Sequence, residues 1–369
     1  MFLATLFNSK SIFDRTARLN FVVTPVLLLI FAVIVFSKLY VGNPIECMTP
    51  NQFTDDKKQY AEGICLLSTY VIPLEHIPSE IGDHQSLEIS YLRWIPFILA
   101  LQALMFYAPK LLWDSWHCQS GIDINSIMYD IQRICALTYE ERQNEILTLV
   151  SHIKNHLLHA RRRILSICYI LTKTLSLINL LVQFLLINYY FGLWKISWED
   201  IDGYGLQAFP KISFCDLQWR NLGQINRFTI QCFLSVNTFN EFIYVTLWFW
   251  ILFLTIITLI NFIYELIILF NQKMQDKMLR HHLKREKQQN PEFSNNFEVV
   301  FNRVFTNGIS SDIILFIRFI ERYSGTIMAD DFCAQLLAQH TQNDYVENVP
   351  TNPSAYKLLS TKESDRTHD

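Results

Sequence analysis

The chain has 369 residues, of which 51% are hydrophobic and 18% are charged, and its formal net charge at pH 7 is −3. Aromatic residues make up 14% of the sequence. Such an apolar composition argues against an ordinary pair of soluble domains, and the small net charge gives no reason to expect a nucleic-acid partner.

Four apolar segments carry few or no charges and approach or exceed the ~20 residues that a membrane-spanning helix needs. They predict transmembrane helices at 19–40, 94–113, 164–194 and 242–270. Four buried helices of a soluble protein are the alternative, but soluble helices of this length usually show a polar face. The first segment is too long for the apolar part of a signal peptide, and Ser37-Lys38-Leu39-Tyr40 is a poor cleavage site. The expected fold class is an all-α membrane protein with four transmembrane helices.

The distribution of charge predicts which side each connecting segment occupies. Fifteen lysines and arginines lie in 1–18, 114–163 and the start of 271–340, whereas 41–93 and 195–241 hold seven, with thirteen acidic residues. The positive-inside rule therefore places both termini and the middle loop in the cytoplasm. The segments 41–93 and 195–241 become the two outside loops.

Cysteine positions agree with this orientation. The first outside loop holds Cys47 and Cys65, and the second holds Cys215 and Cys232. An even number of cysteines in each loop predicts disulfides in an oxidising compartment. The similar spacings suit two loops joined in antiparallel fashion, Cys47 to Cys232 and Cys65 to Cys215, while bridges within each loop are the alternative, because four cysteines allow three connectivities. The remaining four are predicted to be free thiols: Cys118, Cys135, Cys168 and Cys333.

The cytoplasmic segments are predicted to be mainly helical. Isoleucines recur at helical spacing from Ile124 to Ile134, and an apolar pattern from Phe297 to Leu337 indicates a small helical module within 271–340, with a turn at Ser324-Gly325. The polar composition of 341–369 predicts disorder. The amphipathic segment 1–18 has two interpretations, a disordered tip or a short helix at a pore mouth or on the membrane surface.

No motif supports catalysis or a cofactor. The chain has no phosphate-binding glycine loop, no His-Glu-x-x-His sequence and no nucleophile elbow. His152, His156 and His159 share a helical face, but no nearby carboxylate or cysteine completes a metal site, so no metal is predicted. No predicted span has a carboxylate at its centre, which argues against proton-coupled transport, and Glu265 is expected to be interfacial.

Three stretches carry a resemblance to a known family. Tyr91-Leu92-Arg93-Trp94-Ile95-Pro96-Phe97 resembles the innexin signature Tyr-Tyr-Gln-Trp-Val-Pro-Phe, with Tyr91, Trp94 and Pro96 matching and Leu92 and Arg93 departing from it. The first outside loop, YVGNPIECMTPNQFTDDKKQYAEGIC, is similar to that of innexins, and so is FPKISFCDLQWRNLGQINRFTIQC in the second. Connexins fit less well because they have three cysteines in each outside loop.

The resemblance implies a large-pore channel subunit. Innexins assemble into rings, with eight subunits suggested for the family, and a ring docks to another ring on the neighbouring cell. The resemblance does not choose between rings of one kind of subunit and rings of several kinds. Membrane lipids would be further partners. The amino-terminal segment would form the pore funnel, and the acidic first outside loop would favour cations. The pore-lining candidates are Met1, Phe2, Leu3, Leu6, Phe7, Glu46, Asp55 and Asp56.

Two other functions compete with a gap-junction channel. An undocked hemichannel that releases small molecules such as ATP would share the fold and the pore, whereas a four-span adhesion or scaffold protein would have no pore. The basic residues from Lys273 to Lys287 also have two interpretations. They either bind anionic lipid or only reflect the excess of positive charge on the cytoplasmic side, and the second interpretation is the simpler.

Overall fold

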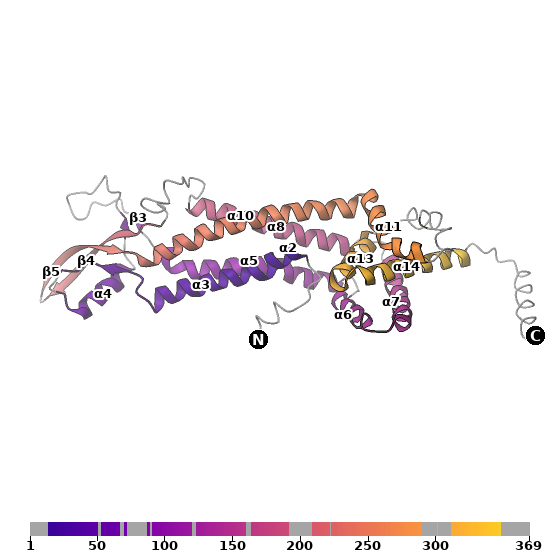
Figure 1. The fold of residues 1–369 in the computed structure, drawn as a ribbon. Coiled ribbons are helices and arrows are strands. Elements are labelled where there is room, and N and C mark those ends of the chain that lie inside the picture. Colours follow the sequence, from indigo (N-terminus) through magenta and orange to yellow (C-terminus); the bar gives the residue numbers. More distant parts are fainter. Residues whose placement is uncertain are drawn as a thin grey trace, which may run out of the picture. The chain divides into compact units, whose positions relative to one another are not determined.

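The computed structural model describes residues 14–50, 53–66, 70–71, 87–88, 91–119, 123–159, 164–191, 209–221, 223–289, 301 and 311–347 (Figure 1). Contacts divide the chain into two compact units. Unit 1 comprises Met1–Trp116 and Tyr169–Tyr264, and unit 2 comprises His117–Cys168 and Glu265–Asp369. Met1, Phe2, Leu3, Leu6 and Phe7 lie outside the described residues, as does the predicted tail beyond Glu347.

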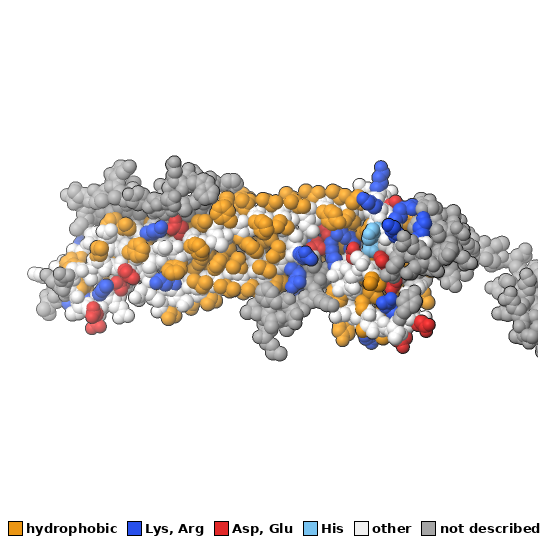
Figure 2. Space-filling view, viewed as in Figure 1, with side chains coloured by type: hydrophobic (Ala, Val, Ile, Leu, Met, Phe, Trp, Pro, Cys, Tyr) orange, Lys and Arg blue, Asp and Glu red, His pale blue; other side chains and the backbone are white. Residues whose placement is uncertain are grey.

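Four long helices are apolar enough to cross a membrane: Arg15–Tyr40, Tyr91–Trp116, Ile164–Tyr189 and Ser235–Phe270. The first is a continuous run of α2 (Arg15–Arg18), η1 (Leu19–Val23) and α3 (Thr24–Tyr40). The second joins η3 (Tyr91–Trp94) to α5 (Ile95–Gln119). The others are α8 (Ile164–Phe191) and α10 (Ser235–Phe270), and Figure 2 shows hydrophobic side chains gathered on the surface along these helices.

The first helix contains a π-helical turn at η1, next to Pro25 in the first turn of α3. Proline has no backbone N–H, so it cannot donate to the preceding turn. The residue before it, Thr24, donates twice to the Leu19 carbonyl, from its backbone N–H in the i→i−5 pattern of a π turn and from its Oγ1 at 2.9 Å. The helix therefore continues without an interruption of its backbone.

One end of unit 1 carries a small domain that we call the cap, formed by α4 (Asp55–Cys65) and a five-stranded antiparallel sheet of order β1-β5-β4-β2-β3. Strands β1 (Glu46–Cys47), β2 (Tyr70–Val71) and β3 (Leu87–Glu88) are short, whereas β4 (Ile212–Asn221) and β5 (Gln224–Phe233) form a long hairpin. Its turn contains Gly223, whose φ of 92° is strained for residues with a side chain.

The sequence predicted disulfide-joined loops here but no sheet. The chain is nevertheless mainly helical with four long apolar helices, so the predicted class is confirmed and the sheet is an addition to it. The residues from Ile212 to Leu217 alternate between outward and buried positions, and so do several residues of β5. A period of two in residue type is the signal of a half-buried strand, and the sequence shows it in β5 from Phe228 to Cys232 but not from Ile212 to Cys215.

Unit 2 is helical. It contains α6 (Ile124–Ile134), α7 (Tyr139–His159), α11 (Gln272–Gln289), α13 (Ser311–Ser324) and α14 (Thr326–Glu347). Asp123 caps α6 by accepting hydrogen bonds from the backbone N–H groups of Asn125 and Ser126. Helix α14 packs against α7, α11 and α13. It extends to Glu347, so the first seven residues of the predicted disordered tail are helical.

The predicted turn at Ser324-Gly325 separates α13 from α14, and Gly325 has a φ of 95° there. Helix α6 buries Ile124, Ile131 and Ile134 on one face. The three histidines of α7 lie in a helix, but their side chains are outside the described residues. The helical character predicted for the loop 114–163 and for the module within 271–340 is thus present in the structure.

Candidate functional site at the cap

The first disulfide joins two neighbouring strands. Cys47 of β1 lies directly opposite Cys232 of β5, and the two sulfurs are bonded, with Cα atoms 4.0 Å apart. The Cys47 N–H donates to Glu62 Oε1 at 3.3 Å, while the next N–H, of Met48, donates to the Gln231 carbonyl. The cysteines therefore occupy a pair without mutual backbone hydrogen bonds, the position where opposite residues approach most closely.

The second disulfide attaches the helix to the sheet. Cys65 ends α4 and is bonded to Cys215 of β4, with Cα atoms 5.5 Å apart. All four cysteines are buried. Both bridges join 41–93 to 195–241, which is the antiparallel connectivity among the three that the sequence left open.

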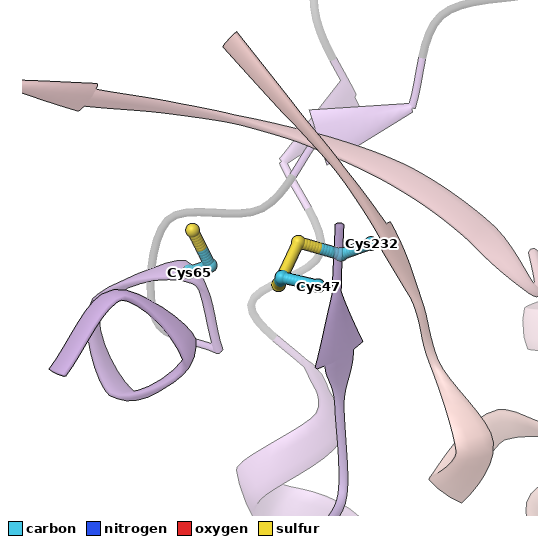
Figure 3. A group of neighbouring side chains, drawn as sticks. All are labelled: Cys47, Cys65 and Cys232. Carbon is cyan, nitrogen blue, oxygen red and sulfur yellow. A yellow bond between two sulfur atoms is a disulfide. The ribbon is translucent and has the colours of Figure 1, made fainter. Parts of the chain in front are cut away.

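The two bridges lie side by side. The sulfurs of Cys47, Cys65 and Cys232 are all within 4.8 Å of one another, and Figure 3 shows the Cys65 sulfur next to the Cys47–Cys232 bond. Three clustered cysteines can indicate a metal centre, but metals bind thiolates, and these sulfurs are consumed in disulfides. The cluster is therefore a covalent brace at the centre of the cap.

An aromatic layer lies between α4 and the hairpin. The Trp219 ring meets Phe53 and Tyr60 edge-on, with centroids 6.1 and 5.8 Å away, and Phe53 meets Phe228 at 5.8 Å. Lys57 lies over the Trp219 ring at 5.5 Å. Edge-to-face pairs of this kind add specific geometry to hydrophobic burial. They hold the helix against the hairpin in one orientation.

The outer part of the hairpin has open edges among the described strands. Strand β1 pairs only with Cys232 and Phe233, and β2 reaches β4 only at Phe214. Residues 223–227 are exposed, and Thr229 donates to Asp216 across the hairpin at 2.7 Å. Unpaired strand edges offer backbone donors and acceptors to another chain. Among the described residues, the turn end of the hairpin is therefore an exposed part of the cap.

Polar contacts fix the hairpin to the helices. Asn237 at the start of α10 donates to the Pro210 carbonyl at 2.9 Å and to the Tyr91 hydroxyl at 3.5 Å. Ser235 Oγ donates to the Asn43 carbonyl at 2.8 Å, and Lys211 is 3.1 Å from Glu241. Tyr91 therefore serves as a contact between the second and fourth long helices.

The other predicted residues are distributed over the cap and its base. Pro96 is buried in the first turn of α5, where its missing N–H costs little, and Trp94 is 61% exposed. Glu46, Asp55 and Asp56 are all exposed, the first on β1 and the others in the first turn of α4. The structure therefore gathers the cysteines into one cluster and leaves the three carboxylates on the surface of the cap.

A buried ion pair within unit 1 was not anticipated. Lys173 of α8, expected near the membrane edge, is 4% exposed, and its Nζ lies 2.7 Å from Asp14 Oδ2, at the residue that caps α2. Tyr169 donates to the same carboxylate at 3.2 Å, and Lys173 donates to Asn261 of α10 at 3.1 Å. The only signal in the sequence was that Lys173 is a charged residue within a long apolar segment, which requires a partner if it is buried.

Unit 2 contains a second buried cluster. Glu265 was expected to be interfacial, but it is 2% exposed and accepts hydrogen bonds from Arg318 and Arg322 of α13. Charged side chains are buried in this way when partners compensate for their lost hydration. The sequence did not indicate these partners, because both lie more than 50 residues further along the chain.

Comparison with known proteins identifies relatives along nearly the whole chain. The innexin family model matches residues 13–340. Innexin-3 of Caenorhabditis elegans is 31% identical over 377 residues, which cover 92% of this chain and 87% of that protein. Innexin unc-9 of the same organism is 32% identical over 292 residues, covering 68% and 73% respectively. Innexin-16 is 31% identical over 332 residues, covering 86% and 87%.

Proposed function

This chain belongs to the innexin family of gap-junction channel proteins and is a multi-pass membrane protein of cell junctions, and from that premise we propose that its cap docks to the cap of a like channel on the adjacent cell. The supporting observation is the pair of disulfides that brace the hairpin from two directions. A rigid surface loses little conformational entropy when it binds. The cap is therefore prepared for a partner before contact.

The proposal includes an orientation. The cap lies outside the cell, and both termini and unit 2 lie in the cytoplasm. Disulfides persist in oxidising surroundings, and positively charged residues are concentrated in the segments assigned to the cytoplasm. These two arguments are independent of each other and agree.

The assembly is a ring around an aqueous pore, with eight subunits as the number suggested by the family resemblance. The amino-terminal segment forms the narrow part of the pore. Asp14 supports this assignment, because its ion pair with Lys173 holds the point at which residues 1–13 join the first long helix. Glu46, Asp55 and Asp56 repeat around the ring and favour cations over anions. A catalytic role forms no part of this proposal.

Paired-cell recording tests docking. Two cells that both express this chain should show electrical coupling and dye transfer, and a pair in which one cell lacks any such channel should not. Reductant added outside should abolish coupling if the bridges face outward. Single-cell conductance without coupling would instead indicate an undocked hemichannel, and neither signal would indicate an adhesion or scaffold protein. Reversal potentials that show anion preference would overturn the assignment of the carboxylates.

A further inference from the structure

Helix α11 follows α10 directly and has two different faces. Asn271 separates the helices, and its side chain accepts a hydrogen bond from the Lys273 N–H at 3.0 Å, which caps the new helix. One face, containing Gln275, Leu279, His282 and Leu283, is buried. Helix α11 packs against α14, and His282 contacts Asp330 there at 2.9 Å. The opposite face is left to the surface.

Three lysines occupy the exposed face. Lys273, Lys277 and Lys284 are all exposed and fall within about 40° of one another around the helix axis. Arg280 lies in the same stripe but is already engaged, because Asp276 accepts from it at 2.9 Å and it lies over the Phe301 ring. The stripe is therefore a row of ammonium groups that begins where the apolar helix ends.

A shallow, open hollow of about 660 Å³ lies at the first of these lysines. Its walls combine apolar side chains of α10 with polar residues at the start of α11: Leu266, Ile267, Phe270, Asn271, Gln272 and Lys273. Phe270 is 67% exposed and Ile267 is 45% exposed. The hollow thus presents an apolar wall beside a positive charge, within a few residues of the end of a membrane-spanning helix.

We propose that this hollow and the lysine stripe bind an anionic phospholipid of the leaflet that surrounds the end of α10. The acyl chains lie against Ile267 and Phe270, and the phosphate lies at Lys273. Lys277 and Lys284 add attraction to neighbouring anionic headgroups, as juxtamembrane lysines do. The other nearby charges do not oppose this, because Asp276 is paired with Arg280 and Glu265 is buried with Arg318.

The alternative explanation is that these lysines only set the orientation of the chain in the membrane, as the positive-inside rule describes. That rule requires charge near the end of a helix but neither a hollow nor an apolar wall beside it. The packing of the other face against α14 explains why the lysines share one face, but it does not explain the apolar wall beside Lys273. A local binding site accounts for that wall.

Native mass spectrometry of the full-length assembly tests the proposal. After delipidation, phosphatidylserine should be retained more strongly than phosphatidylcholine. Lys273→Gln should weaken that retention roughly fivefold, which is the expected value of one charge near the surface. Lys277→Gln and Lys284→Gln should have progressively smaller effects, because they lie further along α11 from the hollow. Equal retention of the two lipids by the unmodified assembly would overturn the proposal.

Controls separate the site from general charge. Changing all three lysines to arginine should leave the preference intact. Arg133→Gln removes an equally exposed charge from α6 and should also leave it intact. Soluble glycerophosphoserine should not compete with the lipid, because it lacks the chains that contact Phe270. Effective competition would show a simple phosphate site and would contradict the proposal.

A fluorescence measurement keeps the test independent of the lysine variants. Phe270→Trp places a reporter on the wall of the hollow. Brominated phosphatidylserine should quench the added fluorescence more than brominated phosphatidylcholine at the same concentration. Equal quenching by the two lipids would show that the wall contacts membrane without selecting a headgroup, and the proposal would fail.

Discussion

The cap and unit 2 are stabilised by different kinds of bond. In the cap, three of the five strands have two residues each, and two disulfides cross the small core. In the described part of unit 2, five helices of 11 to 22 residues pack together, and the contacts between them include ionic and polar pairs. Small units bury too little apolar surface to be stable alone and need covalent bonds. Long amphipathic helices bury enough apolar surface to be stable without disulfides, and the polar pairs between them specify which helices pack together.

The sulfur chemistry follows the same division. In the cap, Cys47, Cys65, Cys215 and Cys232 are all oxidised. Among the described residues of unit 2, Cys135, Cys168 and Cys333 are free thiols. This is the expected result if the two regions lie in different redox compartments, as the proposed orientation requires. The comparison can therefore be tested by removing a disulfide from the cap and a charged partner from unit 2.

Loss of a cap disulfide should have the largest effect on coupling between cells. Cys232→Ser removes the bridge to Cys47 and should destabilise the cap by about 2–5 kcal/mol, because the bridge joins segments 185 residues apart. We expect junctional conductance between paired cells to fall to background while surface labelling shows whether the protein reaches the membrane. Cys135→Ser, which changes a free thiol of unit 2, should couple normally. Normal coupling by the Cys232→Ser chain would contradict the role of the brace.

Removal of Glu265 should have the largest effect in unit 2. Glu265→Gln removes the carboxylate that accepts from the buried Arg318 and the partly exposed Arg322, and breaking a buried ion pair typically costs roughly 3–5 kcal/mol. Hydrogen exchange of α13 should become faster, whereas exchange in the cap should not change. Asp276→Asn breaks a half-exposed pair within one helix and should cost less than about 1 kcal/mol.

A combined change distinguishes charge balance from packing. Replacement of all three residues by apolar ones, as in E265L/R318M/R322M, should restore much of the protection that Glu265→Gln loses, because no uncompensated charge remains. If the triple variant exchanges as fast as the single variant, then the cluster supplies more than charge neutrality.

The ion pair between Asp14 and Lys173 should contribute less to stability than the Glu265 cluster does. Asp14→Asn and Lys173→Met should each lower the thermal stability of the purified channel. The double variant D14N/K173M should lose less than the sum of the two single losses, with a coupling energy of roughly 0.5–3 kcal/mol in a double-mutant cycle. Additive single effects would show that the two side chains do not stabilise each other. Unlike the disulfides, this pair should be insensitive to reductant.

Cys333 should give the smallest effect on function. Burial raises the pKa of its thiol, and the nearby carboxylates of Asp330 and Glu321 raise it further. A raised pKa leaves less thiolate at pH 7.4 than an ordinary cysteine has, so maleimide should label Cys333 more slowly than the partly exposed Cys135. Labelling followed by mass spectrometry checks the two rates, and Cys333→Ser should leave coupling unchanged. Equal labelling rates in the folded protein would contradict its burial.

The sequence by itself determined the features that depend on local composition. Four uninterrupted apolar segments make four long helices, because a spanning helix satisfies its own backbone hydrogen bonds. The two pairs of cysteines predicted disulfides in the cap, and the signature at Tyr91, Trp94 and Pro96 together with the two cysteine-bearing loops indicated the family. The helical character of α6 and the turn at Gly325 were predicted for the same local reason.

Tertiary structure decided which distant residues meet. Cys47 bonds Cys232 because β1 pairs with β5, and these two strands come from different loops, so neither loop alone determines how they pair. Lys173 and Glu265 looked like charges at the edge of a membrane, and only the packed helices show Asp14 beside the first and Arg318 beside the second. A buried charge is stable only with a partner, and a partner that lies 50 to 160 residues away leaves no local pattern in the sequence.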